Sequence, residues 1–123
     1  MNISTRKVDG IFVVDIIGRI VLGEGSRLRE VISLALDSGD RKLLLNLAEV
    51  DYIDSAGLGE IIRAYTSVAK RGGQLHLLKL TNRVRDLLQI TKLCTVLETH
   101  DDEAEAVVLL NRAIAPGKVA ATG

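Results

Sequence analysis

The sequence predicts a single α/β domain built on a mixed, largely parallel sheet. Strand patterns and helix patterns alternate along the chain in the order β-β-α-β-α-β-α-β-α, which is typical of parallel strands joined by helices. The chain has 123 residues, of which 47% are hydrophobic, and a domain of that length can bury its own core. We therefore expect four to five strands and about four helices in one domain over residues 1–114, with a flexible tail at 115–123.

The first two strands are predicted to form a hairpin. Asp9-Gly10 separates two apolar stretches, and this pair is typical of a two-residue turn between antiparallel strands. The strands are expected around residues 3–8 and 11–17, where alternate side chains share one face. A glycine-containing loop over residues 18–25 follows.

A helix, a buried strand and a second helix come next. Apolar residues at helical spacing predict a helix over about 27–37, with Ser26 as its N-cap and Gly39 as its C-terminal cap. Residues 43–47 form a short apolar run, which is typical of a central strand covered on both faces. The second helix is expected over about 55–71.

The last part of the chain repeats the strand-helix pattern. A fourth strand is expected over residues 74–80, and a short fifth strand around Val96 and Leu97. The last helix is expected to bury Ala106, Val107, Leu110 and Ile114 and to end at Pro116-Gly117. A third helix, capped by Thr81 or Asn82, is expected between these strands with Val84, Leu87 and Leu88 on its inner face. Asp101 or Asp102 can cap the last helix.

Composition excludes several classes of function. Sixteen basic residues balance sixteen acidic ones, which argues against direct DNA binding, because nucleic-acid binders carry a basic excess. One cysteine and two histidines leave too few ligands for a structural metal site. No apolar run is long enough for a membrane span or a signal peptide. We therefore expect a cytoplasmic chain with no metal, no cofactor and no membrane insertion.

The strongest functional signal is the segment between the central strand and the second helix. Asp54 is placed to cap that helix, and Ser55 falls at about its first position, with its side chain toward solvent. Free amides at a helix start can donate to an anion, so a phosphate on Ser55 would be tolerated there. The plainer interpretation, an ordinary capping pair with Gly57 and Gly59 allowing close packing, stays open on spacing alone.

The chain lacks the residues of an enzyme site. A serine hydrolase would have glycine two positions before its nucleophile, and that position is Ile53. His76 lies in a predicted strand and His100 in a predicted loop, so no signal puts a base beside Ser55. Cys94 is expected to pack as a small apolar group. We predict no catalytic residue.

Charges are segregated along the neutral chain. Acidic residues surround Ser55 in the sequence, whereas residues 63–92 hold seven bases and one acid, Asp86. Ordinary solvated surfaces would explain this segregation. A second interpretation is electrostatic steering of a partner, with Arg63 on the contact surface. The acidic residues are Glu49, Asp51, Asp54 and Glu60.

The serine segment and its flanks resemble one family. The resemblance continues through residues 47–53 before the motif and through Gly72-Gly73 after it, and the element order matches from about Ile3 to Ile114. The family is that of STAS domains, specifically the bacterial anti-sigma factor antagonists. The motif reads Asp54-Ser55-Ala56-Gly57-Leu58-Gly59.

The resemblance implies a fold, a function and a set of partners. In that family, a serine kinase that doubles as an anti-sigma factor phosphorylates the serine that corresponds to Ser55. The unphosphorylated antagonist binds the anti-sigma factor and frees the sigma factor, and a protein phosphatase restores the binding form. Ser55 is then the phosphorylation site. The partner-binding residues implied are Asp54, Ala56, Gly57, Leu58, Gly59 and Arg63.

One departure and two alternatives accompany the resemblance. Better-known members carry an acidic residue shortly after the glycine that ends the second strand, whereas this chain has Gly18-Arg19-Ile20-Val21. The identity of the partner is therefore open. There are two alternatives. One is a non-switching STAS module docked on a membrane transporter or its ATPase subunit, and the other is a copy in a stressosome-like scaffold. Whether the chain forms a homodimer is also open.

Overall fold

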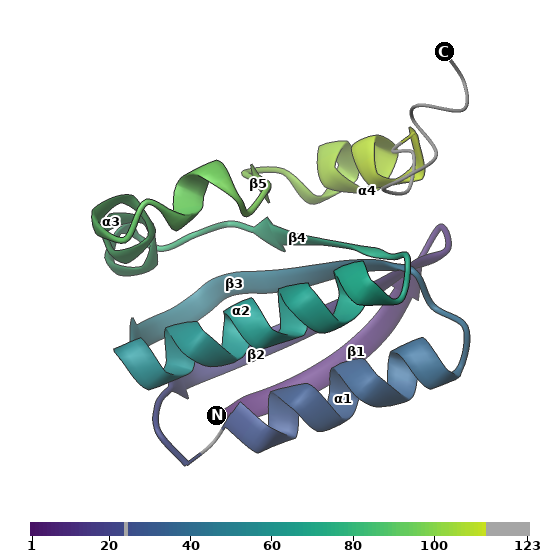
Figure 1. The fold of residues 1–123 in the computed structure, drawn as a ribbon. Helices are drawn as coiled ribbons and strands as arrows, with labels where there is room; N and C mark the ends of the chain where they lie inside the picture. Colours follow the sequence, from purple (N-terminus) through teal and green to yellow (C-terminus); the bar gives the residue numbers. More distant parts are fainter. Residues whose placement is uncertain (24, 113–123) are drawn as a thin grey trace.

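The computed structural model describes residues 1–23 and 25–112. They form a five-stranded sheet in the order β1-β2-β3-β4-β5, in which only β1 and β2 are antiparallel among the described pairs (Figure 1). The fold class expected from the sequence is confirmed. In chain order the elements are β1 (Asn2–Val8), β2 (Ile11–Ile20), α1 (Gly25–Asp37), β3 (Lys42–Ile53), α2 (Ser55–Lys70), β4 (Gln74–Leu78), α3 (Asn82–Ile90), the 3-10 helix η1 (Leu93–Thr95), β5 (Thr99–His100) and α4 (Glu103–Arg112).

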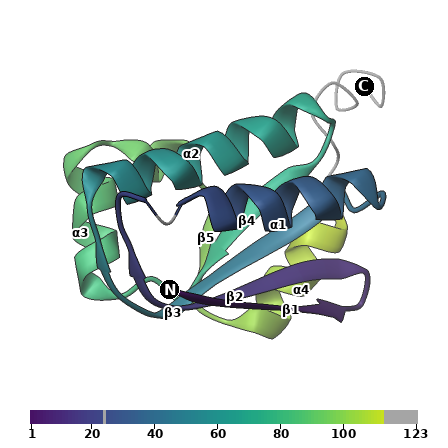
Figure 2. The same cartoon turned by 90° about the horizontal axis from the view of Figure 1, so that it is seen from below.

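Helices cover both faces of the sheet. Figure 2 shows α1 and α2 side by side on one face and α4 on the other. Because both faces are covered where β3 begins, Leu43, Leu44 and Leu45 are all fully buried, with Leu44 in the smaller core under α4. The larger core, under α1 and α2, includes Val14, Ile16, Leu45, Leu47, Leu75, Leu77, Leu28, Ile32, Ile61 and Val68.

Local signals set the hairpin turn and three of the helix caps as expected. Asp9 and Gly10 both have positive φ, 49° and 82°, as a two-residue turn of the type I′ kind requires. Gly39, with φ 100°, ends α1, and the next amide donates to the Ala35 carbonyl at 3.0 Å. Thr81 rather than Asn82 caps α3. Asp102 caps α4 by accepting from the Glu105 amide at 2.9 Å.

Two strands are longer than expected. β2 runs to Ile20 instead of residue 17, and β3 runs to Ile53 instead of residue 47. The two strands stay paired through two register shifts, one of them next to Gly18, whose φ of 103° suits such an irregularity. Polar residues in the extended part of β3 face solvent, so no continuous apolar run marked it.

Four local predictions were wrong. The fifth strand lies at Thr99–His100, because η1 and the chain after it keep Val96 and Leu97 away from β4 pairing. Ser26 is the second residue of α1, not its N-cap. Cys94 is exposed rather than packed. His100 lies in β5 rather than in a loop. Ile114, the expected helix end at Pro116-Gly117 and the expected tail at 115–123 lie outside the described residues.

Candidate phosphorylation and partner-binding site

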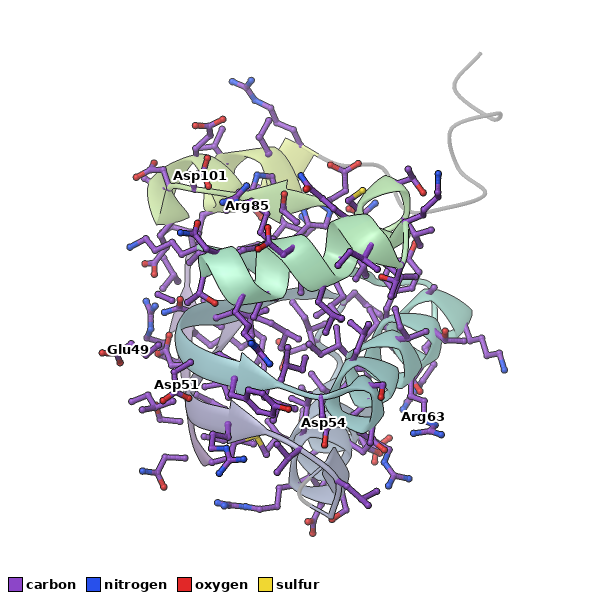
Figure 3. The ribbon with its side chains drawn as sticks, turned by 90° about the vertical axis from the view of Figure 1, so that its left-hand side faces the viewer. Glu49, Asp51, Asp54, Arg63, Arg85 and Asp101 are labelled. Atoms are coloured by element: carbon purple, nitrogen blue, oxygen red, sulfur yellow. The ribbon has the colours of Figure 1, made fainter. Side chains whose placement is uncertain are left out.

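Ser55 is the first residue of α2 and is exposed. It lies where the parallel strands β2 and β3 end, and in open α/β sheets ligands bind outside these carboxyl ends. Figure 3 looks onto this edge of the molecule, with Asp54 near the centre of the view. The serine hydroxyl is therefore presented on an accessible surface.

Asp54 fixes the backbone around Ser55. Its Oδ1 accepts a hydrogen bond from the Gly57 amide at 2.7 Å, and its Oδ2 accepts one from the Leu22 amide at 3.2 Å. Its own amide donates to the Ile20 carbonyl at 3.3 Å. One carboxylate thus joins the start of α2 to the loop after β2. The hydrogen bonds from Gly57 and then Leu22 lower the pKa of Asp54, so the carboxylate is charged at neutral pH.

Gly57 allows α2 to approach β2 closely. A Cβ built at Gly57 would lie 1.9 Å from the Ile20 carbonyl oxygen, whereas one at Gly59 would meet nothing nearer than the Arg63 guanidinium at 3.9 Å. Leu58 is 6% exposed and belongs to the core. The close-packing explanation therefore holds for Gly57, and Gly57 and Leu58 support the segment from within, while Ala56 and Gly59 are half-buried.

The acidic residues near Ser55 in the sequence do not form one acidic surface. Glu60 contacts Arg63 through Oε1 at 2.7 Å and Arg29 through Oε2 at 2.8 Å, so its charge is balanced and links α2 to α1. Figure 3 shows Glu49 and Asp51 on one side of Asp54 and Arg63 on the other. Arg63 is exposed, on the helix that begins at Ser55, but it is not a free cation.

Arg19, Tyr52 and Arg83 meet at this edge. The sequence did not indicate that these three residues form a group. The Arg83 Cζ lies 4.6 Å from the centre of the Tyr52 ring, and the Arg19 Cζ lies 5.2 Å from it. Tyr52 and Arg19 are paired in the β2–β3 register. The register shifts between these strands made that pairing unreadable from spacing. Only the unusual Arg19 after Gly18 signalled the position.

A surface hollow with both apolar and charged lining residues adjoins these residues. It has a volume of about 260 Å³ and is lined by Ile53, Arg83, Asp86, Leu87 and Ile90. Because Ile53 immediately precedes Asp54, the hollow lies beside the Ser55 segment. Another hollow of about 300 Å³ lies between α1 and α2, and none of its lining residues belongs to the 54–59 segment.

The described residues offer Ser55 no histidine base. His76 and His100 contact each other, with Nδ1 and Nε2 at 2.8 Å and their rings stacked. No cluster of three or more His, Cys, Asp or Glu side chains suited to a metal ion occurs within residues 1–23 and 25–112. Over the same ranges, no helix has the length and apolar character that crossing a membrane requires.

Fold and site together define a small α/β domain that presents a capped serine at the carboxyl edge of its sheet. The family model described as STAS domain matches residues 2–106. The chain therefore belongs to the STAS domain family.

Known proteins similar to this chain include antagonists and a transporter-family protein. The anti-sigma-B factor antagonist of Staphylococcus aureus is 27% identical over 101 residues, which cover 82% of this chain and 94% of that protein. The crystal structure of an anti-sigma factor antagonist from Mycobacterium paratuberculosis has a TM-score of 0.79 at 19% identity, covering 89% of this chain and 93% of that one. A sulfate transporter family protein from Wolinella succinogenes has a TM-score of 0.74 at 21% identity, covering 85% and 87%. The two structural likenesses establish the fold.

Proposed function

We propose that this protein is an anti-sigma factor antagonist in a partner-switching pathway. In its unphosphorylated form it binds an anti-sigma factor that is also a serine kinase, and so frees the sigma factor. Phosphorylation of Ser55 ends that binding, and a protein phosphatase reverses the modification. The protein acts as a binding partner and a kinase substrate rather than as an enzyme.

The observation that carries this proposal is the exposed Ser55 at the start of α2, held by the Asp54 cap. A kinase must reach the hydroxyl, and the edge position leaves it accessible. A phosphate adds a charge of about −1.5 to −2 at neutral pH. In a surface that a partner must desolvate, an unpaired charge costs several kcal/mol, enough to break a complex. The names of the similar antagonists support the same role.

Phosphorylation tests the site. The protein is incubated with ATP and purified serine kinases encoded in the same genome. Intact-mass measurement counts the phosphates added, and peptide mapping locates the modified residue. We expect one phosphate on the wild type, at Ser55, and none on Ser55→Ala. A Ser55→Ala variant that is still fully phosphorylated would refute the assignment.

Binding tests the switch. Isothermal titration calorimetry with the same kinase should give Ser55→Ala the same affinity as the unphosphorylated wild type. Ser55→Asp should bind about tenfold or more weakly, because it carries a charge into the contact. Equal affinities for the two variants would refute the switch even if Ser55 is a kinase substrate.

A transporter-docked module is the second candidate, favoured by the fold it shares with the Wolinella protein. The same binding experiment separates the two. A domain that only docks on a transporter would bind no kinase, and no kinase would modify it at Ser55.

A further inference from the structure

Two arginine side chains near the start of α2 lie over an aromatic ring but form no ion pair within the described residues. Arg19 and Arg83 are exposed, and the guanidinium group of each lies over the ring of Tyr52; we name this group the Arg-Tyr-Arg cluster. Within residues 1–23 and 25–112, neither arginine contacts a carboxylate. In the same ranges, ion pairs with carboxylates occupy Arg6, Arg29, Arg63, Arg71 and Arg85.

The ring prepares the two guanidinium groups for a ligand. Stacking on an aromatic face holds a guanidinium in place while its N–H donors stay in the plane of the group, free for a planar acceptor such as a carboxylate. An arginine held in this way loses less side-chain entropy when it binds than a freely moving one does. The cluster therefore suits an anionic group better than two separate surface arginines would.

Apolar surface lies next to this charge. The hollow beside Arg83 is lined by Ile53, Leu87 and Ile90, and Ile90 is 78% exposed. Leu22 is 80% exposed and donates its amide to Asp54. Both side chains are large aliphatic groups left in solvent at the edge that carries Ser55. An exposed apolar site beside fixed cations is typical of a protein contact surface.

We propose that the Arg-Tyr-Arg cluster and the adjoining hollow form a docking surface for an acidic segment of the partner protein. Carboxylates of that segment bind Arg19 and Arg83, and a neighbouring aliphatic side chain enters the hollow against Ile90. This inference rests on the proposed function and adds the chemistry of the partner.

Charge favours a protein segment over a nucleic acid. The chain has no net charge, and Asp86 lines the hollow itself. Asp54 adds a carboxylate at the same edge. A run of phosphates would meet these two acids, whereas a peptide with one or two carboxylates can place them on the arginines alone.

A peptide titration tests the surface without any knowledge of the partner. Amide shifts of the ¹⁵N-labelled full chain are followed with the N-acetylated and C-amidated peptide Glu-Leu-Asp-Leu, which carries two carboxylates, and with its uncharged match Gln-Leu-Asn-Leu, blocked in the same way. We expect shifts at residues 19, 52, 83 and 90 with the acidic peptide and an affinity at least threefold weaker for the uncharged one. Equal affinities, shifts elsewhere, or tighter binding of a short oligothymidylate would overturn the proposal.

Paired variants locate the effect. Arg83→Ala and Arg85→Ala remove the same charge from the same helix, but Arg85 faces Asp101 at 3.5 Å instead of Tyr52. We expect Arg83→Ala, and more strongly Arg19→Ala with Arg83→Ala, to weaken both the peptide and the kinase. The double variant should bind the kinase about tenfold more weakly. Arg85→Ala should stay within twofold of the wild type, and equal losses in Arg83→Ala and Arg85→Ala would contradict the proposal.

The two proposals fail in different ways. A wild type that binds acidic peptide through the cluster but is neither bound nor modified by a kinase contradicts the proposed function alone. A wild type that is phosphorylated at Ser55 and bound by the kinase, with the double variant unaffected, contradicts the docking surface alone. Circular dichroism of each variant separates a lost contact from a lost fold.

Discussion

Gly57 shows how one residue sets the geometry of the site. The absence of a side chain lets the start of α2 lie against the Ile20 carbonyl, and Asp54 bonds to both the Gly57 amide and the loop after Ile20. The position of the Ser55 hydroxyl therefore depends on contacts made by its neighbours. This dependence makes Gly57 the most sensitive position of the segment.

Replacing Gly57 by alanine should destabilise the protein by about 1–3 kcal/mol, as overpacking against backbone does. The added methyl group would lie 1.9 Å from a carbonyl oxygen that belongs to a central strand and cannot move freely. Urea unfolding measures the effect. Gly59→Ala is the matched control, because it lies in the same helix with open space around it, and there alanine should be neutral or stabilise by about 0.5–1 kcal/mol. Equal losses would contradict the contact.

The Asp54 cap could be predicted from the sequence, and the Gly57 contact could not. A cap depends on residues within one turn of the helix, so aspartate before an apolar helix was a sufficient signal. The Gly57 contact joins two segments more than thirty positions apart, and it exists only because β2 runs to Ile20. The sequence alone does not distinguish Gly57, which packs against the Ile20 carbonyl, from Gly59, which has open space around it.

At the scale of elements, α4 is held to the sheet by a charged network as well as by its small core. Arg6 of β1 bonds to Asp15 of β2 at 2.7 Å and also to Glu103 at the start of α4. Asn46 of β3 donates to the same Asp15 at 2.8 Å. One arginine therefore connects the edge strand β1 to the last helix.

Replacing Arg6 by alanine should destabilise the protein by about 1–2 kcal/mol at pH 7. The side chain is 38% exposed, so water screens part of the attraction, but its removal leaves Asp15 and Glu103 without their cation. Chemical unfolding gives the value. Arg85→Ala, which removes a looser pair at 3.5 Å, should cost no more than about 0.5 kcal/mol. A loss for Arg6→Ala no larger than this control would contradict the network.

Because of the same network, the stability lost in Arg6→Ala should depend on pH. The hydrogen bond from Arg6 is the main reason that the pKa values of Asp15 and Glu103 are lowered in the folded state. A lowered pKa stabilises the fold above the unfolded value, near 4, and this contribution disappears as pH falls through the folded value. The difference between the wild type and Arg6→Ala should therefore shrink from pH 7 toward pH 3. A difference that stays constant over this range would contradict the assignment.

Element order and the first hairpin were predictable because each helix, strand and turn has its own pattern, but the register of β2 on β3 and the position of the last strand were not. The Leu43-Leu44-Leu45 run shows burial on both faces directly. β5 is different, since it has only two residues and pairs with β4 through the backbone. Leu97 is buried, as its apolar character suggests, yet it is buried as part of the connection and not as part of the sheet.

At the scale of the whole molecule, the switch should act on the surface and leave the fold unchanged. Ser55 is exposed and belongs to neither hydrophobic core of the described residues, so a charge there displaces no core side chain. The amides at the start of α2 favour an anion, while Asp54 opposes a second one nearby. The two effects have opposite signs, so they offset each other in part.

Ser55→Asp should therefore unfold within about 0.5 kcal/mol of the wild type, while it binds the kinase at least about tenfold more weakly. Its ¹⁵N amide spectrum should shift only near residues 22 and 54–58, because Asp54 joins these two segments. Raising the salt concentration should reduce any stability difference, since the charges involved are exposed. A large loss of stability, or shifts that spread through β4 and α4, would mean instead that the modification changes the fold. The proposed partner would then recognise the whole domain rather than one charged edge.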